Sequence, residues 1–191
     1  SRGRAEEQGG LARCREAELR AACEAVGAAP PRFLGAMDGA VDDREPALRR
    51  ALDDELAALA PSLLLCGGPD GAYGHRDHLA CWRLCEAAWR ALHRERTRLL
   101  QAAFPRGLFA PLWRRLRRFA FIEASLGAAD LGVDEAHVDH VLVLSDEERE
   151  RKATMLACHE SQLLDGDPRT FLLPEIARWV LAHEWYLEAR C

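Results

Sequence analysis

Apolar residues recur every three or four positions in several long stretches of the chain, the spacing that puts them on one face of a helix. Proline at position 46 suits the first turn of one such helix, and Ser145 with Glu148 forms a capping box at the start of another. The pattern predicts helices over residues 12–26, 45–59, 79–100, 145–162 and 174–188.

Short strands are predicted between these helices, over residues 32–34, 62–66 and 138–144. Prolines at positions 30, 31 and 61 end the preceding helices, and Asp38-Gly39 is expected to form a turn. Residues 101–131 are interrupted by prolines and glycines, so this segment is interpreted as a lid or insertion. The alternation of helices and strands predicts one α/β domain over residues 1–191.

The composition fits a domain with a real core, because 49% of the 191 residues are hydrophobic and 30% are charged. A formal net charge of -5 argues against nucleic-acid binding, which needs a surplus of positive charge facing the phosphates. No apolar run approaches the roughly 18 residues that a transmembrane helix needs. The seven cysteines form an odd set without a C-x-x-C pair, which favours reduced thiols in a cytoplasmic protein.

The block Gly71-Ala72-Tyr73-Gly74-His75-Arg76-Asp77-His78 carries the clearest chemical signal. It follows the apolar run ending in Cys66 and leads into a helical pattern. A strand, a glycine-rich turn and two histidines flanking an aspartate bring imidazoles to the carboxyl end of a strand, where open α/β sheets bind ligands. Ring nitrogens hold zinc or stabilise charge, so the block is predicted to be half of a metal site.

A second metal site could be drawn from Cys81 and Cys85, one helical turn apart, together with His78. We favour the alternative that both cysteines are small buried hydrophobes.

Five short motifs, this block among them, occur in a fixed order: Ser1-Arg2-Gly3, an R-x-x-E-L helix from Arg15 to Val26-Gly27, Met37-Asp38-Gly39, Gly71 to His78, and Lys152-Ala153 with His159-Glu160-Ser161-Gln162. Together they resemble the LmbE-like N-acetylglucosaminyl deacetylases, which include phosphatidylinositol-glycan and mycothiol or bacillithiol pathway enzymes. The resemblance covers nearly the whole chain, and five matches in order are more specific than any one alone.

The resemblance implies a Rossmann-like three-layer sandwich with a mostly parallel sheet. It also implies a zinc enzyme that removes the N-acetyl group from an N-acetylglucosamine conjugate, lipid- or inositol-linked, and releases acetate. By this likeness His78 is a zinc ligand and His75 is the electrostatic stabiliser or general acid. Asp77 would orient an imidazole or tune its charge, and Tyr73 would donate a hydrogen bond to the oxyanion or cap the site.

Arg15 and Asp38 correspond, by the same resemblance, to an arginine and an aspartate that grip sugar hydroxyls. A second interpretation stays open for each: Arg15 on a solvated helix face or paired with Glu18, and Asp38 serving only its turn. His159 is interpreted as a packing or capping residue near the site entrance. Iron stays open as an alternative to zinc.

One part of the family pattern, the H-P-D-D-E segment with two zinc ligands and the general base, does not occur in this sequence. We therefore expect an amino-terminally truncated form that lacks the first strand and exposes strand edges, with poor solubility or oligomer formation. Three functions stay open: the zinc-dependent deacetylase, a catalytically incomplete relative that binds a sugar conjugate or protein partner, and a zinc hydrolase acting on a non-sugar amide.

Arginines are interleaved with aromatic and leucine side chains between residues 94 and 119. This composition suits a membrane surface or an anionic substrate, and a membrane surface would favour a lipid-linked aminosugar. We favour a helical lid or oligomer contact with a solvated arginine face.

Overall fold

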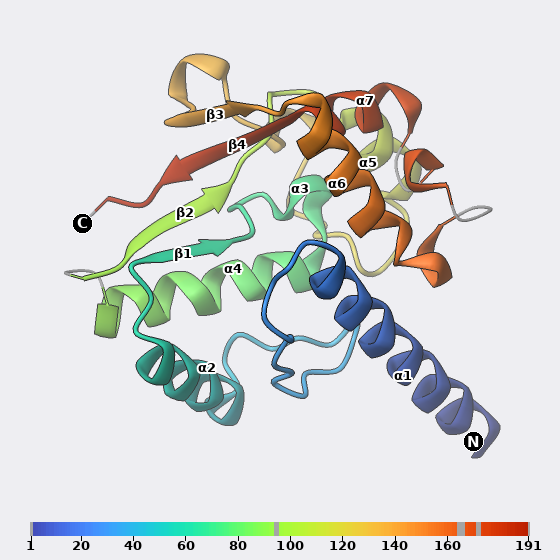
Figure 1. Ribbon diagram of the computed structural model, residues 1–191, viewed down its shortest axis with the longest axis vertical. Coiled ribbons are helices and arrows are strands. Elements are labelled where there is room, and N and C mark those ends of the chain that lie inside the picture. The colour runs from blue at the N-terminus through green and yellow to red at the C-terminus, as the bar shows by residue number, and fades with distance from the viewer. Residues whose placement is uncertain (1, 94–95, 164–166, 171–172, 191) are drawn as a thin grey trace. The chain divides into compact units, whose positions relative to one another are not determined.

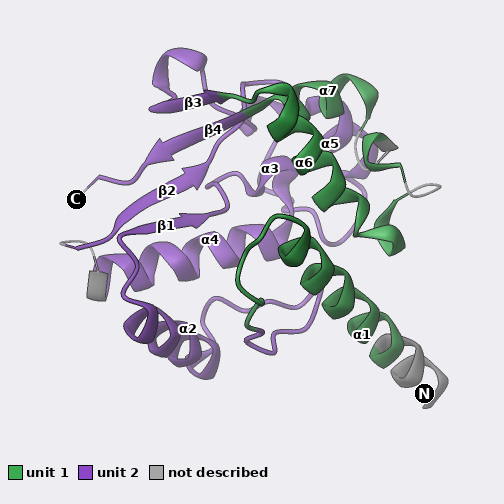
Figure 2. Ribbon diagram, in the orientation of Figure 1, with its two compact units in different colours: residues 1–32, 143–183 green, residues 33–142, 184–191 purple. Residues whose placement is uncertain are grey.

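The computed structural model describes residues 2–93, 96–163, 167–170 and 173–190 (Figure 1). Ser1, in the first of the five motifs, and residue 94, at the start of the arginine-rich segment, lie outside these residues. The chain divides into two compact units: unit 1 comprises residues 1–32 and 143–183, and unit 2 comprises residues 33–142 and 184–191 (Figure 2). Each unit is described separately, and the expected single domain stays a prediction.

Most of unit 2 is a sheet with helices beside it. Its helices are α2 (Pro46–Leu59), α3 (Gly71–Gly74), α4 (Arg76–Ala88) and α5 (Ala110–Leu116). The strands of the sheet are β1 (Leu63–Cys66), β2 (Arg98–Ala102), β3 (His140–Val143) and β4 (His183–Glu188), in the spatial order β1-β2-β4-β3.

The sheet is mixed, and the expectation of a mostly parallel sheet is wrong. β1 and β2 are parallel, with Leu64 opposite Leu99, whereas β2 and β4 are antiparallel. The antiparallel neighbour arises because the predicted last helix ends early. α7 (Pro174–Ala182) stops at Ala182, and the residues that follow pair with β2 as β4.

The helix predicted over residues 79–100 also ends early, and its last predicted residues belong to β2. The helix predicted over residues 79–100 gives way after α4 to a π-helical turn at Trp89–His93, and residues 98–102 form a strand. Leu99 and Gln101 are 0% and 7% exposed. Pairing with β1 and burial of this face outweigh the local helical pattern, because strand propensity depends on neighbouring strands.

The core of unit 2 lies between the sheet and α4, which runs alongside β1 (Figure 1). α4 contributes Leu79, Leu84 and Ala88, all buried, and the adjoining Trp89 is 2% exposed. α2 has the predicted bounds and buries Leu48 and Leu56. β1 is therefore followed by α4, which packs back along it, and the turn between them lies at the edge of the sheet.

Residues 32–34 do not form the predicted strand. The segment is irregular, and Gly35 has a φ of +77°, which interrupts an extended backbone. The following turn is confirmed: the Ala40 N–H donates to the Met37 carbonyl at 3.1 Å, and Gly39 also has a φ of +77°.

Unit 1 contains α1 (Arg2–Ala25), α6 (Asp146–Ala157) and α7, with 3-10 turns at Glu160–Gln162 and Pro168–Thr170. The capping box is confirmed, since the Ser145 N–H donates to Glu148 at 2.7 Å and Ser145 Oγ accepts from the Glu148 N–H at 3.3 Å. α6 ends before the predicted residue 162 because its last part tightens into a 3-10 turn. Over the described residues, seven α-helices are present in the two units together, and none is long and apolar enough to cross a membrane.

Candidate active site

The candidate site begins in the glycine turn after β1. A Cβ atom on Gly68 would lie 2.1 Å from the carbonyl oxygen of Ala102, the last residue of β2. Only glycine allows two backbone segments to approach so closely. The turn therefore passes directly over the carboxyl end of β2, at the edge where the parallel pair of strands ends.

Asp70 fastens the next part of the turn. Its carboxylate accepts the Ala72 N–H at 2.9 Å and the Gly132 N–H at 2.8 Å. Burial raises the pKa of Asp70, and these backbone N–H groups act against that rise. Ala72 has a φ of +65°, a conformation that costs a non-glycine residue about 1–3 kcal/mol. The two hydrogen bonds hold this strained turn in place.

The turn brings three aromatic side chains into contact. The imidazoles of His75 and His78 stack with centroids 4.6 Å apart, and Tyr73 meets them edge-on at 5.9 and 5.6 Å. Phe121 stacks on His75 at 5.2 Å. Tyr73, His75 and His78 are thus brought together, and we call them the ring cluster.

The hydrogen bonds of the two imidazoles assign them opposite tautomers. Nδ1 of His78 lies 3.2 Å from the Gly71 carbonyl oxygen, which can only accept, so we assign the proton to Nδ1 and a lone pair to Nε2. Nδ1 of His75 accepts the Asp77 N–H at 3.2 Å, so neutral His75 carries its proton on Nε2. His78 is therefore poised to coordinate a cation, and His75 to donate a hydrogen bond.

The environment favours the uncharged forms of His75 and Tyr73. Burial lowers the pKa of His75, and repulsion from His78 lowers it further, against opposing effects of Asp77 and Asp38. Burial, followed by the nearby Asp38 carboxylate, raises the pKa of Tyr73. At neutral pH, Tyr73 is a phenol and a hydrogen-bond donor.

Asp77 connects the ring cluster to the predicted sugar-contact turn. Its carboxylate accepts the Gly39 N–H at 2.6 Å and the Val41 N–H at 3.3 Å. Asp77 is 9% exposed. The Asp38-Gly39 turn is thereby held against the start of α4, where Asp38 acts electrostatically on Tyr73 and His75. The sequence did not indicate this link, because an Asp-Gly turn motif does not show which distant side chain accepts its backbone N–H groups.

Arg15 belongs to α1 in unit 1, whereas the other five predicted site residues belong to unit 2, so its assignment stays a prediction. Within unit 1, the buried Glu18 accepts from the Ser161 N–H at 2.6 Å and the Ser161 hydroxyl at 2.8 Å. The R-x-x-E-L and H-x-S-Q motifs are therefore joined by one buried carboxylate. Burial raises the pKa of Glu18, but the Ser161 hydrogen bonds and nearby His159 prevail and lower it.

Comparison with known proteins identifies the family. Residues 1–89 match the PIG-L family, described as GlcNAc-PI de-N-acetylase. A 1D-myo-inositol 2-acetamido-2-deoxy-alpha-D-glucopyranoside deacetylase of Mycolicibacterium gilvum is 30% identical over 203 residues, which cover 91% of this chain and 68% of that relative. The chain belongs to the PIG-L family.

Two other relatives of the same name support this assignment. The deacetylase of Acidothermus cellulolyticus is 28% identical over 207 residues, which cover 97% of this chain and 71% of the relative. The deacetylase of Corynebacterium glutamicum strain R is 30% identical over 138 residues, which cover 72% of this chain and 42% of that relative. The resemblance predicted from five short motifs is confirmed, and the PIG-L match spans Arg15, Asp38 and the Gly71 to His78 block.

A zinc ion in a PIG-L protein would need several donors besides His78, because zinc takes four ligands. His78 Nε2 fits as one. Within residues 2–93, 96–163, 167–170 and 173–190, however, no three His, Cys, Asp or Glu side chains form a group that could hold a metal. The described residues therefore do not complete a zinc site around His75 and His78, nor one formed by His78 with Cys81 and Cys85.

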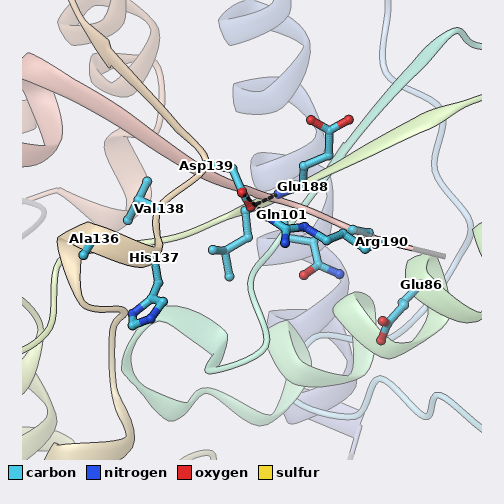
Figure 3. Close-up of a pocket in the computed structure, with 10 residues that line it drawn as sticks. Glu86, Gln101, Ala136, His137, Val138, Asp139, Glu188 and Arg190 are labelled. Atoms are coloured by element: carbon cyan, nitrogen blue, oxygen red, sulfur yellow. Dashed lines mark hydrogen bonds and ion pairs between the residues drawn. The ribbon is translucent and has the colours of Figure 1, made fainter.

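A hollow in this PIG-L chain lies elsewhere in unit 2. It measures about 470 Å³ and is lined by the ends of β2 and β4 and by the segment before β3 (Figure 3). None of the ring-cluster residues lines it. Its carboxylates are already engaged: Asp139 accepts the Glu188 N–H at 2.9 Å and pairs with Arg190 at 2.7 Å. We therefore locate the candidate site at the ring cluster and not at this hollow.

Proposed function

We propose that this PIG-L protein hydrolyses the N-acetyl group of an inositol-linked N-acetylglucosamine conjugate, producing acetate and a free amine. The carrying observation is the ring cluster, in which two stacked imidazoles have opposite tautomers beside a phenol. The relatives, which are named as deacetylases of a 2-acetamido sugar attached to inositol, supply the substrate class.

The residues of the cluster have distinct roles in this proposal. Amide hydrolysis passes through a tetrahedral oxyanion, and donors that face it lower the barrier. The Nε2–H of His75 and the phenol of Tyr73 are such donors. Once protonated to the imidazolium by the proton released from the attacking water, His75 can also act as general acid toward the leaving amine. Asp38 accepts hydrogen bonds from sugar hydroxyls, and Asp77 keeps the Asp38 turn in position.

The proposal includes one zinc ligand, His78. A bound zinc ion would polarise the amide carbonyl and make a nucleophile of water. His78 would supply one ligand through Nε2, and the described residues offer no complete ligand set.

The Rossmann-like three-layer arrangement belongs to the same proposal, supported by the step from β1 through the glycine turn to α4. A cytoplasmic location is also proposed, on the basis of the odd set of seven cysteines.

The second candidate is a relative that binds the sugar conjugate without hydrolysing it. The observation that favours it is the single metal donor that the ring cluster presents. A hydrolase of non-sugar amides is distinguished from both by a panel of N-acetylated compounds.

The test measures acetate release and binding with 1D-myo-inositol 2-acetamido-2-deoxy-alpha-D-glucopyranoside, together with zinc per chain. His75→Ala is expected to lower the rate about 100-fold or more through loss of its proton and hydrogen bond. His78→Ala is expected to lower bound zinc as well. His137→Ala, at the hollow, is the matched control and should keep both properties.

The outcomes separate the candidates. Binding without acetate release by the unaltered chain would favour the non-catalytic relative. Failure of the unaltered chain both to bind and to hydrolyse this conjugate would contradict the sugar substrate, and the panel would then decide.

A further inference from the structure

Four exposed arginines lie together at the end of α5 and just beyond it: Arg114, Arg115, Arg117 and Arg118. None of them forms an ion pair with a residue in the part of the chain that the structure describes. Two other exposed arginines of unit 2 are paired, Arg106 with Asp134 at 2.7 Å and Arg76 with Glu123 at 3.7 Å. The described residues therefore leave four positive charges, close together in the sequence, without a counterion.

The ring of Phe119 adds an apolar group beside these charges. Phe119 is 54% exposed, and its ring stacks on that of Phe121 with centroids 5.3 Å apart. An exposed aromatic ring beside several arginines is typical of segments that bind at a membrane interface, where the charges meet headgroups and the ring meets acyl chains. We call the four arginines and Phe119 the basic surface.

The basic surface is fixed next to the ring cluster. On the inner side of α5, Trp113 Cδ1 lies 3.8 Å from the position that a Cβ atom on Gly74 would take. The Arg76 N–H donates to the Phe121 carbonyl at 2.8 Å, and the Glu123 N–H donates to the Gly74 carbonyl at 2.7 Å. A partner on the basic surface therefore lies close to the turn that carries the cluster.

We propose that the basic surface docks the chain on a membrane that contains anionic phospholipids. Its guanidinium groups contact lipid phosphates, and the Phe119 ring enters the boundary between headgroups and acyl chains. The inference does not depend on the proposed deacetylase activity, because binding to vesicles is measured without a substrate.

Charge complementarity favours a membrane over other partners. The contact between copies favoured from the sequence would bring the arginines of both copies together in a two-fold interface, where like charges repel. A nucleic-acid strand stacks successive bases on several exposed rings, and the basic surface offers one. A lipid surface responds to charges within about 8 Å, so the net charge of -5 of the whole chain does not prevent the contact.

The experiment measures co-sedimentation of the full chain with vesicles of phosphatidylcholine alone, and with vesicles of phosphatidylcholine and phosphatidylserine in equal parts. The unaltered chain should pellet only with the anionic vesicles, and less as the salt concentration rises. Arg114→Gln combined with Arg115→Gln should weaken binding about 25-fold, since each arginine near an anionic membrane contributes about fivefold. Phe119→Ala should weaken it several-fold.

Two control variants separate this surface from charge in general. Arg83→Gln combined with Arg90→Gln removes the same charge from exposed arginines of unit 2 outside the basic surface, and it should bind like the unaltered chain. Arg114→Lys combined with Arg115→Lys keeps the positive charge and should also bind.

Three vesicle results would overturn the inference: pelleting with neither kind of vesicle, equal pelleting with both, or an equal loss of binding in the Arg83 and Arg90 control. A lipid-free dimer that the Arg114 and Arg115 glutamine variant disperses would assign the surface to a second copy instead. If that variant does not fold, hydrogen exchange of the unaltered chain decides, because anionic vesicles should protect residues 114–119 and a lack of protection there would contradict the docking.

Discussion

The ring cluster and the hollow of unit 2 differ in how many of their polar atoms are available to bind a ligand. At the hollow, Glu188 is bound by Arg98 at 2.7 Å and by His140 at 2.9 Å, and Asp139 is bound by Arg190. At the ring cluster, the hydrogen bonds that the imidazoles make with the described residues occupy only the Nδ1 atom of each ring. The carboxylates of the hollow are already engaged, whereas the cluster has more unused bonding capacity.

This difference indicates how a candidate site should be chosen in such a chain. A ligand that enters the hollow must compete with ion pairs that are already formed. A ligand at the cluster meets a lone pair on His78, a proton on His75 and a phenol on Tyr73, and both imidazoles are held by neighbouring backbone groups. Availability of polar atoms distinguishes the two regions.

The largest stability effect is expected at the turn that supports the cluster. Gly68→Ala would place a methyl group 2.1 Å from the Ala102 carbonyl oxygen, and a backbone atom cannot rotate away. We expect a loss of about 3 kcal/mol. Thermal unfolding measures it, with Gly67→Ala as the control, since the nearest atom to a Cβ there is at 3.9 Å. Equal melting temperatures for the two variants would contradict the close approach.

A smaller effect is expected from two matched carboxylates, one in each region. Asp77→Asn leaves a backbone N–H of the Asp38 turn without its acceptor, at a cost of about 1–3 kcal/mol. Hydrogen exchange at Gly39 and Val41 should accelerate, and deacetylation should slow. Asp139→Asn makes the comparable change at the hollow, where the carboxylate also accepts a backbone N–H.

Two results would contradict this difference between the cluster and the hollow. If Asp139→Asn slowed deacetylation as much as Asp77→Asn, the hollow would belong to the site. If exchange at Gly39 did not change in Asp77→Asn, the carboxylate would not be what holds the turn.

The sequence predicted those parts of the fold that depend on local chemistry. The bounds of α2 follow from prolines at its two ends, and the Ser145 cap follows from a four-residue motif. β2 and β4 could not be predicted in this way, because residues 98–102 and 183–188 become strands only by pairing with each other and with β1. The local pattern of both segments also suits a helix.

The same limit applies to the site. The Gly71 to His78 block predicted that two imidazoles and a phenol would meet, since all three lie on one short turn. The support from Asp70 to Gly132 and from Asp77 to Gly39 joins residues far apart in the chain. No spacing in the sequence records such contacts.

The smallest effect is expected from the ion pairs of the hollow, through Glu188. Hydrogen bonds from Arg98, followed by that from His140, lower the pKa of Glu188 from 4.5 to about 2. A carboxylate whose pKa is lower in the folded state contributes stability above its unfolded pKa, and that contribution is lost as the pH falls toward 2. Glu188→Gln should therefore melt slightly below the unaltered chain at neutral pH, with a difference that shrinks in acid. Because the Glu188 side chain is 31% exposed and water screens the pair, the shift should be smaller than that of Gly68→Ala. A larger shift would mean that the hollow supports the fold more than its exposure suggests.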